Sequence, residues 1–145
     1  MAKLVHSMIR VIDEARSIDF YRRAFRLELA ERIAFDDFAL VYLRHPTEDD
    51  FELELTVNFG RTEPYELGNG YGHLAVVVDE LDAEHARFTA EGFNPRPLKD
   101  FMNKEVLVAR FFFVADPDGY QIEVIQKGGR FGKATPPSSS PGSSG

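Results

Sequence analysis

The stretch HSMIRV, residues 6–11, decides how the rest of the chain is interpreted, because a similar stretch, HLAVVV, occurs at residues 73–78. Each begins with histidine and continues with the apolar pattern of a β-strand. Two later strand-like stretches, FELEL at 51–55 and YQIEV at 120–124, place Glu54 and Glu123 at similar distances behind the two histidines. The pattern indicates a duplicated unit in which each half carries one histidine and one glutamate.

Composition limits the class of protein. A chain of 145 residues with 43% hydrophobic residues and 13 phenylalanines can form one compact domain or two small modules that share a core. The absence of cysteine excludes disulfides, thiolate metal sites and a cysteine nucleophile, so any metal would have nitrogen and oxygen ligands. No signal peptide or membrane-spanning run is recognisable, which predicts a soluble cytoplasmic protein with no membrane partner. A net charge of -7 argues against nucleic acid as a partner.

Periodicity and turn residues predict the order βαβββ in each half, an α+β fold made of two tandem modules. In the first module, 1–66, alternation predicts strands at 4–12, 27–35, 38–44 and 51–58, with a helix from 13 to 25. In the second, 67–131, strands are predicted at 73–78, 106–114 and 120–126, with a helix over 79–91 that ends at Gly92. The Pro, Ser and Gly residues of 132–145 predict a disordered tail.

The repeated residues suggest a metal centre. Two neutral imidazoles and two carboxylates neutralise a divalent ion and leave coordination positions for substrate. An unpaired carboxylate within an apolar strand is costly, and the sequence contains this arrangement twice, at Glu54 and Glu123. Taken singly, each residue of the set fits a surface or hydrogen-bonded role better; repetition at matching positions favours ligands. His45 and His85 have no counterpart, and we expect them to be structural or exposed to solvent.

Arg10 lies on the same face of the first strand as His6, because strand side chains alternate. Its guanidinium suits bidentate binding of a substrate carboxylate. The alternative is an ion pair with one of the many acidic residues of the chain.

Over residues 3–130 the sequence resembles the glyoxalase I family of the vicinal oxygen chelate superfamily. The resemblance is carried by HSMIRV at 6–11, SIDFY at 17–21, ELTVNFG at 54–60, YELG at 65–68, GYGHL at 70–74 and DPDGYQIE at 116–123. The DPDGY run is common across the superfamily. The ELT-x-N and GYGH runs are much more specific.

The resemblance implies the glyoxalase/bleomycin resistance/dioxygenase fold, with curved mixed sheets that form the site in a homodimer. It implies isomerisation of the hemithioacetal of methylglyoxal and glutathione to S-lactoylglutathione, with glutathione as co-substrate. Glu123 would be the base and Glu54 the opposing carboxylate, while Arg10 and Asn58 would bind glutathione. One divalent metal per site, nickel or cobalt rather than zinc, would be held between subunits by His6, Glu54, His73 and Glu123.

Two positions depart from the family pattern. Arg26 follows the first helix where the family usually has a glycine, which predicts a different helix end. The stretch 98–106 lacks the family's Lys-Gly loop that contacts glutathione, and Lys104 is the candidate substitute. The alternatives are another vicinal oxygen chelate enzyme, such as an epimerase, dioxygenase or thiol transferase, or a metal-free binding module. Methylmalonyl-CoA epimerases generally lack a carboxylate at the position of Glu54, and a binding module would not need four ligands.

Overall fold

The computed structural model describes residues 1–47 and 50–132. Contacts divide the chain into two units: the first contains residues 1–71 and 116–120, and the second contains 72–115 and the chain from 121 onward. The tail predicted over 132–145 lies outside the described residues, apart from Gly132. No helix of the described residues is long and apolar enough to cross a membrane.

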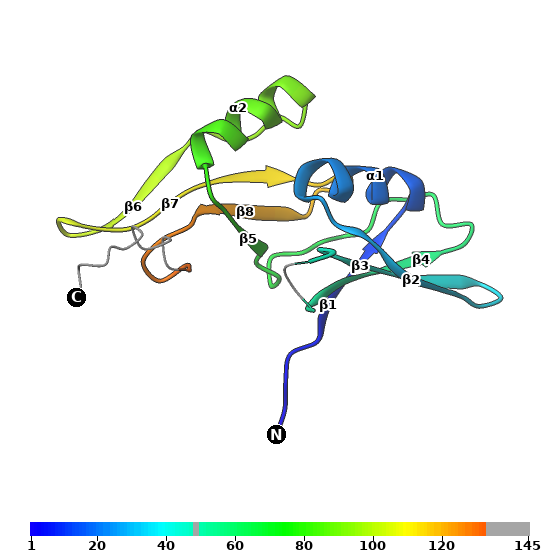
Figure 1. Ribbon diagram of the computed structural model, residues 1–145. Helices are drawn as coiled ribbons and strands as arrows, with labels where there is room; N and C mark the ends of the chain where they lie inside the picture. Colours follow the sequence, from blue (N-terminus) through cyan, green and yellow to red (C-terminus); the bar gives the residue numbers. More distant parts are fainter. Residues whose placement is uncertain (48–49, 133–145) are drawn as a thin grey trace. The chain divides into compact units, whose positions relative to one another are not determined.

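The first unit contains a four-stranded mixed sheet and one helix, shown in blue to green-blue in Figure 1. Strand β1 is at one edge of the sheet and pairs in parallel with β4, and the remaining pairs are antiparallel, giving the order β1-β4-β3-β2. The elements follow the chain as β1 (His6–Val11), α1 (Glu14–Phe25), β2 (Glu28–Ala34), β3 (Phe38–Arg44) and β4 (Glu52–Asn58). The predicted βαβββ order is confirmed for this half.

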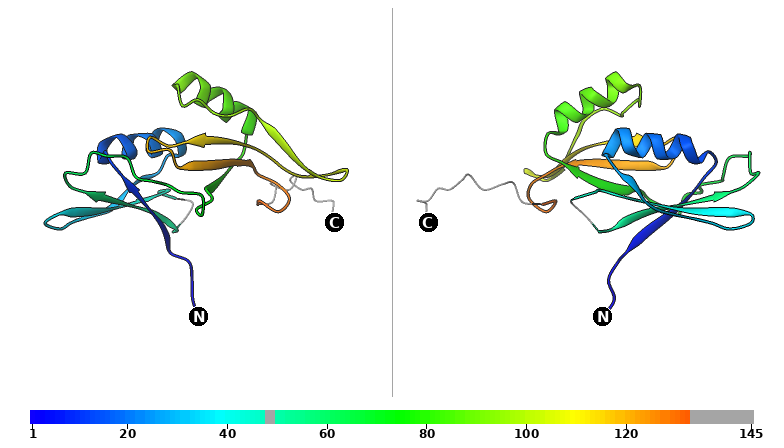
Figure 2. Two further views of the ribbon diagram at one scale, coloured as in Figure 1. Left: turned by 180° about the vertical axis from the view of Figure 1, so that it is seen from behind. Right: turned by 45° about the vertical axis from the view of Figure 1, so that its right-hand side comes forward.

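The two faces of this sheet have different roles because side chains alternate along each strand. Helix α1 lies over one face, as the two views of Figure 2 also show. The side chains buried on that face are Ile9 and Val11 of β1, Ala39, Val41 and Leu43 of β3, and Leu53, Leu55 and Val57 of β4. The opposite face carries the polar side chains of β1 and β4, among them His6, Arg10 and Glu54.

The second unit has the same topology, with strand order β5-β8-β7-β6 and a parallel pair between β5 and β8. Its elements are β5 (Leu74–Val78), α2 (Leu81–Glu91), β6 (Lys99–Asn103), β7 (Val106–Ala115) and β8 (Gln121–Gln126). The tandem fold predicted from the sequence is therefore confirmed. Strand β6 was not located by residue from the sequence, because all five of its residues are exposed and no buried side alternates with a polar one.

The end of α1 shows how Arg26 replaces a glycine. Arg26 adopts left-handed geometry, with φ 60°, and its backbone N–H donates to the carbonyl of Arg22. Gly92 ends α2 with φ 84° in the same way. The prediction that the end of the first helix would differ is wrong, since both helices end in a left-handed residue. A non-glycine residue in this geometry costs about 1 kcal/mol.

Candidate functional site

The first predicted pair of ligands lies side by side on the polar face of the first sheet. His6 stands opposite Glu52 in the parallel pairing of β1 and β4, which places Glu54 two residues further along on the same face. The Nε2 atom of His6 lies 3.0 Å from Oε1 of Glu54. Glu54 is nearly covered, with 10% of its side chain exposed, whereas 39% of His6 is exposed. The pair is thus open to solvent from the histidine side.

The second pair repeats this geometry in the second unit. His73 immediately precedes β5, and Glu123 of β8 stands opposite Ala75 of β5. Glu123 is therefore diagonal to His73, as Glu54 is to His6. The Nε2 atom of His73 lies 3.1 Å from Oε1 of Glu123, and 39% of the histidine side chain is again exposed. The duplication seen in the sequence therefore extends to the arrangement of the side chains.

A third residue belongs to each pair, and sequence reasoning missed it. Tyr42 of β3 stands opposite Glu54, and Phe113 of β7 stands opposite Glu123. Each ring meets the neighbouring histidine edge-on, with centroids 6.0 Å apart for His6 and Tyr42 and 5.1 Å apart for His73 and Phe113. Strand periodicity indicated that these aromatic residues were in strands, but only the register shows which carboxylate each one faces.

The two triplets differ by one hydroxyl group. The hydroxyl of Tyr42 donates a 2.7 Å hydrogen bond to Oε2 of Glu54, and this bond raises the pKa of Tyr42 to about 12. The phenol therefore stays protonated at neutral pH and remains a donor. Among the described residues, Oε2 of Glu123 accepts no hydrogen bond, since Phe113 has no donor to offer.

The side chains fit a divalent metal. Imidazole nitrogen and carboxylate oxygen are both ligands of divalent transition metals. In each pair one nitrogen and one oxygen lie side by side, at 3.0 and 3.1 Å, the distance of a direct His–Glu hydrogen bond. Within residues 1–47 and 50–132 no group of three or more potential metal ligands forms, so each unit brings together one predicted pair and no more.

Arg10 and Asn58, the predicted substrate-binding residues, lie on the same face as His6 and Glu54. Arg10 stands opposite Thr56, so Asn58 is its diagonal neighbour, as Glu54 is for His6. Within the described part of the chain, the guanidinium of Arg10 forms no hydrogen bond or ion pair, and the residue is exposed. The amide nitrogen of Asn58 donates to the hydroxyl of Tyr65 at 2.8 Å, which orients the amide group.

The DPDGY run anchors the fold of the first unit. Asp116 is 6% exposed and accepts three hydrogen bonds: from the Tyr21 hydroxyl at 2.7 Å, and from the backbone N–H groups of Asp118 and Tyr120 at 2.9 Å each. Burial raises the pKa of the Asp116 carboxyl, although its hydrogen bonds act in the opposite direction. Tyr120 in turn donates from its hydroxyl to the carbonyl oxygen of Arg10 at 2.8 Å.

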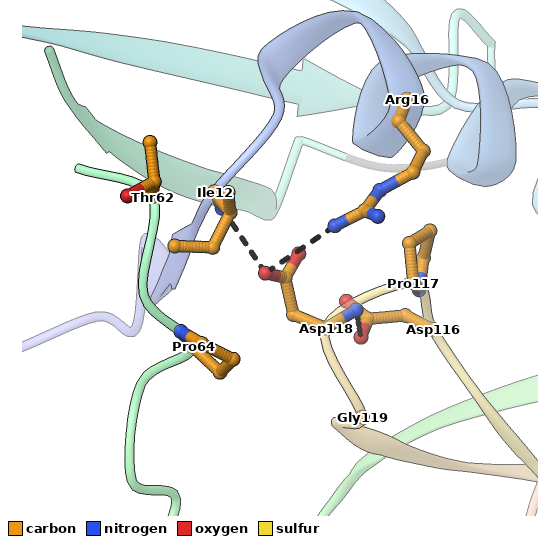
Figure 3. Close-up of a pocket in the computed structure, with 8 residues that line it drawn as sticks. All are labelled: Ile12, Arg16, Thr62, Pro64, Asp116, Pro117, Asp118 and Gly119. Atoms are coloured by element: carbon orange, nitrogen blue, oxygen red, sulfur yellow. Dashed lines mark hydrogen bonds and ion pairs between the residues drawn. The ribbon is translucent and has the colours of Figure 1, made fainter. Parts of the chain in front are cut away.

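Asp118 completes this anchor, as Figure 3 shows. Its Oδ1 atom accepts a 3.0 Å hydrogen bond from the backbone N–H of Ile12 and lies 3.8 Å from the guanidinium of Arg16. The hollow in which it lies has a volume of about 480 Å³ and is lined by Ile12, Arg16, Thr62, Pro64 and residues 116–119. It contains none of the predicted ligands, and the interactions within it explain the start of α1 rather than any chemistry.

The two remaining histidines each hydrogen-bond to a backbone group. Nε2 of His85 donates to the carbonyl oxygen of Arg96 at 2.8 Å, and its ring meets Phe112 edge-on. Nδ1 of His45 accepts from the backbone N–H of Thr47 at 3.2 Å. These contacts agree with the prediction that both histidines are structural or exposed to solvent. Lys104 lies in the turn between β6 and β7 with a left-handed backbone, φ 57°.

Comparisons with known proteins point to one family. A family model described as Glyoxalase/Bleomycin resistance protein/Dioxygenase superfamily matches residues 3–124. The lactoylglutathione lyase of Neisseria meningitidis serogroup A is 39% identical over 129 residues, which cover 86% of this chain and 91% of the relative. The lactoylglutathione lyase of Escherichia coli O157:H7 is 34% identical, with coverage of 86% and 93%.

Solved structures agree with the sequence relatives. The trypanothione-dependent glyoxalase I of Leishmania major superimposes with a TM-score of 0.71 and 31% identity, covering 87% of each chain. Glyoxalase I from Zea mays gives a TM-score of 0.77 with 26% identity, and the match covers 92% of this chain and 46% of the maize chain.

Proposed function

This chain belongs to the Glyoxalase/Bleomycin resistance protein/Dioxygenase superfamily, and we propose that it is a lactoylglutathione lyase, or glyoxalase I. It converts the hemithioacetal of methylglyoxal and glutathione into S-lactoylglutathione and so detoxifies methylglyoxal. The family inferred from the sequence motifs is confirmed. The observation that carries the proposed activity is the pair of His–Glu arrangements, built in the same register in both units.

The four ligands in our proposal are His6, Glu54, His73 and Glu123. A divalent metal bound by them would polarise the hydroxyl and carbonyl oxygens of the substrate and stabilise the negative charge that develops there. A donor set of nitrogen and oxygen only, with positions left open for substrate, suits an octahedral ion, and we therefore propose nickel or cobalt rather than zinc.

Glu123 is the base in this proposal. Its Oε2 atom takes the proton from the carbon that carries the hydroxyl and sulfur, and the same carboxyl returns a proton to the neighbouring carbon. The overall change moves a hydrogen from one carbon to the next and the hydroxyl proton from the first oxygen to the second, so no oxidant or reductant is needed. The Glu123 side chain is 20% exposed, so substrate can reach its Oε2 atom.

Arg10 and Asn58 bind the glutathione part of the substrate. The guanidinium of Arg10 is exposed, and a carboxylate of glutathione offers it a bidentate partner. Asn58, oriented by Tyr65, presents its amide oxygen on the same face. Glutathione is abundant in the cytoplasm, and a chain without cysteine suits that compartment.

We further propose a homodimer in which the first unit of one copy and the second unit of the other supply the ligands of each site. Each unit has only two ligands, and a catalytic metal usually has at least three from protein. Strands β2 and β6 are sheet edges exposed along their full length. Both carry large exposed apolar side chains, Leu29 and Ile33 on β2 and Phe101 and Met102 on β6, of the kind that interfaces cover.

Mixing two inactive variants tests this dimer. One variant, H6A/E54A, lacks both ligands of the first unit, and the other, H73A/E123A, lacks both of the second. Exchange of subunits between them creates one complete site in each mixed dimer if sites form between copies, so activity appears on mixing. Continued inactivity, with subunit exchange verified by mass spectrometry, would contradict the intersubunit arrangement.

The activity itself is tested by ultraviolet absorbance at the thioester band. Metal-free protein is reconstituted separately with Ni²⁺, Co²⁺ and Zn²⁺ and assayed with methylglyoxal and glutathione. We expect turnover with nickel or cobalt, and product identified as S-lactoylglutathione. Parallel assays with trypanothione decide which thiol is preferred. No turnover with any metal or thiol, in correctly folded protein, would refute the proposed function.

A further inference from the structure

The two His–Glu pairs have the same backbone register and differ in the residue that stands opposite each glutamate, Tyr42 or Phe113. We propose that Tyr42 is a positioning residue whose hydroxyl commits Glu54 to holding the metal and leaves Glu123 as the proton acceptor. This inference rests on the proposed lyase function. It goes beyond that function by proposing that one hydroxyl group decides which of the two glutamates, Glu54 or Glu123, accepts the proton.

The first step of the argument is the occupancy of the carboxylate oxygens. Oε1 of Glu54 faces Nε2 of His6 at 3.0 Å, and Oε2 accepts the hydrogen bond from Tyr42 at 2.7 Å. Both oxygens of Glu54 are therefore engaged. In the other pair, Oε1 of Glu123 faces Nε2 of His73 at 3.1 Å, and within the described residues Oε2 has no donor. Only Glu123 keeps an oxygen that can accept a proton from substrate.

The second step is the rigidity of Tyr42. Its chain neighbours in β3, Val41 and Leu43, are fully buried on the α1 face of the sheet, and β3 is hydrogen-bonded on both sides, by β2 and β4. The ring also meets the edge of the His6 ring. The strand therefore fixes the direction in which the Tyr42 side chain leaves the backbone, and rotation of the hydroxyl away from Glu54 would leave a nearly covered carboxylate oxygen unpaired.

The third step is chemical. A carboxylate oxygen that accepts a short hydrogen bond from a neighbouring phenol directs a lone pair at that donor, and less of it is open to a carbon-bound proton of substrate. The same bond fixes the orientation of a carboxylate that binds metal, and loss of such a partner commonly weakens metal binding by about tenfold or more. Tyr42 therefore favours metal binding at Glu54 and opposes proton transfer to it. Phe113 leaves Glu123 in the opposite condition.

The reciprocal variants Y42F and F113Y remove the hydroxyl from one triplet and add it to the other. The first readout is binding of Ni²⁺ to metal-free protein, measured by calorimetry. We expect Y42F to weaken Ni²⁺ binding about tenfold, whereas F113Y, which adds a donor beside Glu123, does not weaken it. Thermal melting of each variant verifies that the fold is intact.

The second readout is turnover at saturating Ni²⁺. F113Y is expected to lower kcat about tenfold with KM nearly unchanged, because the new donor occupies the carboxylate oxygen that receives the proton. In a protein without the base, E123Q, the further change Y42F frees Glu54, so E123Q/Y42F should exceed E123Q in kcat by about tenfold. A residue with a merely structural role would give the double variant no gain.

The outcomes separate this inference from the function on which it rests. Weaker Ni²⁺ binding in Y42F together with a gain in E123Q/Y42F supports it. If the wild type is active but E123Q/Y42F shows no gain over E123Q, the proposed division of roles between Glu54 and Glu123 is wrong, whether or not Y42F binds Ni²⁺ more weakly. The lyase function would remain supported in that case. If the wild type has no lyase activity, the proposed function fails. The role of Tyr42 is then decided by Ni²⁺ affinity alone. A tenfold weaker affinity in Y42F supports that role, and an unchanged affinity overturns it.

Discussion

The hydroxyl of Tyr21 in α1 donates a 2.7 Å hydrogen bond to the buried carboxylate of Asp116, in the loop between β7 and β8. These two residues are 95 positions apart in the sequence, and the bond between them is buried. Tyr21 is 1% exposed, and its burial raises the pKa of the phenol well above the ordinary value. The hydroxyl therefore remains protonated, and a hydrogen-bond donor, at neutral pH.

Replacing Tyr21 with phenylalanine should destabilise the protein by about 1.5–3 kcal/mol, because Asp116 would keep its buried charge and lose its strongest donor. Urea unfolding followed by circular dichroism measures this change. The matched control is Y71F, which removes the hydroxyl of a tyrosine that is 45% exposed and should change stability by less than about 0.5 kcal/mol. Equal effects of the two variants would show that the bond to Asp116 contributes little.

Asp116 should also give the stability a pH dependence of predictable sign. Burial raises its folded pKa above the value of about 3.9 in the unfolded chain, so between the two values the folded state holds a proton that the unfolded chain has released. The contribution of this group is fully present below the unfolded pKa and is lost as pH rises through the folded pKa.

The variant D116N cannot ionise, and its amide oxygen can still accept from the N–H groups of Asp118 and Tyr120. Its stability relative to wild type should therefore increase as pH rises from about 3 to about 6. Unfolding curves for both proteins at several pH values in this interval test the sign. A difference that stays constant, or changes in the opposite direction, would contradict a raised pKa for Asp116.

The left-handed Arg26 offers a stabilising substitution. Glycine adopts this backbone without the steric cost that a Cβ atom imposes, so R26G should stabilise the protein by about 1 kcal/mol. G92A at the matching end of α2 is the control and should destabilise by a similar amount, since Gly92 has φ 84°. Thermal unfolding of the two variants should therefore show shifts in opposite directions.

Arg10 should affect binding of substrate more than chemistry. R10M is expected to raise KM by about tenfold or more, with a smaller effect on kcat, because in the proposed site the guanidinium would contact the glutathione carboxylate and not the reacting carbons. R130M, which removes one exposed positive charge outside the proposed site, is the charge-matched control. If R130M raises KM as much as R10M, the effect belongs to net charge and not to a contact.

The sequence predicted the duplicated fold and both His–Glu pairs because repetition needs no knowledge of tertiary contacts. Strand β6 could not be located, since its five exposed residues show no alternation of buried and polar positions. The contact between Tyr42 and Glu54 depends on the register of two antiparallel strands, which periodicity leaves undetermined. The anchoring role of Asp116 likewise depends on a partner, Tyr21, that only the folded chain brings near.

The central claim is that one metal site uses both His–Glu pairs. The most direct measurement is turnover during titration of metal-free protein with Ni²⁺, in wild type and in the variants H6A/E54A and H73A/E123A. The account predicts that wild-type turnover rises until one Ni²⁺ is bound per chain, and that each variant alone is inactive. Wild-type turnover in either variant would contradict the claim, because that pair would then be dispensable.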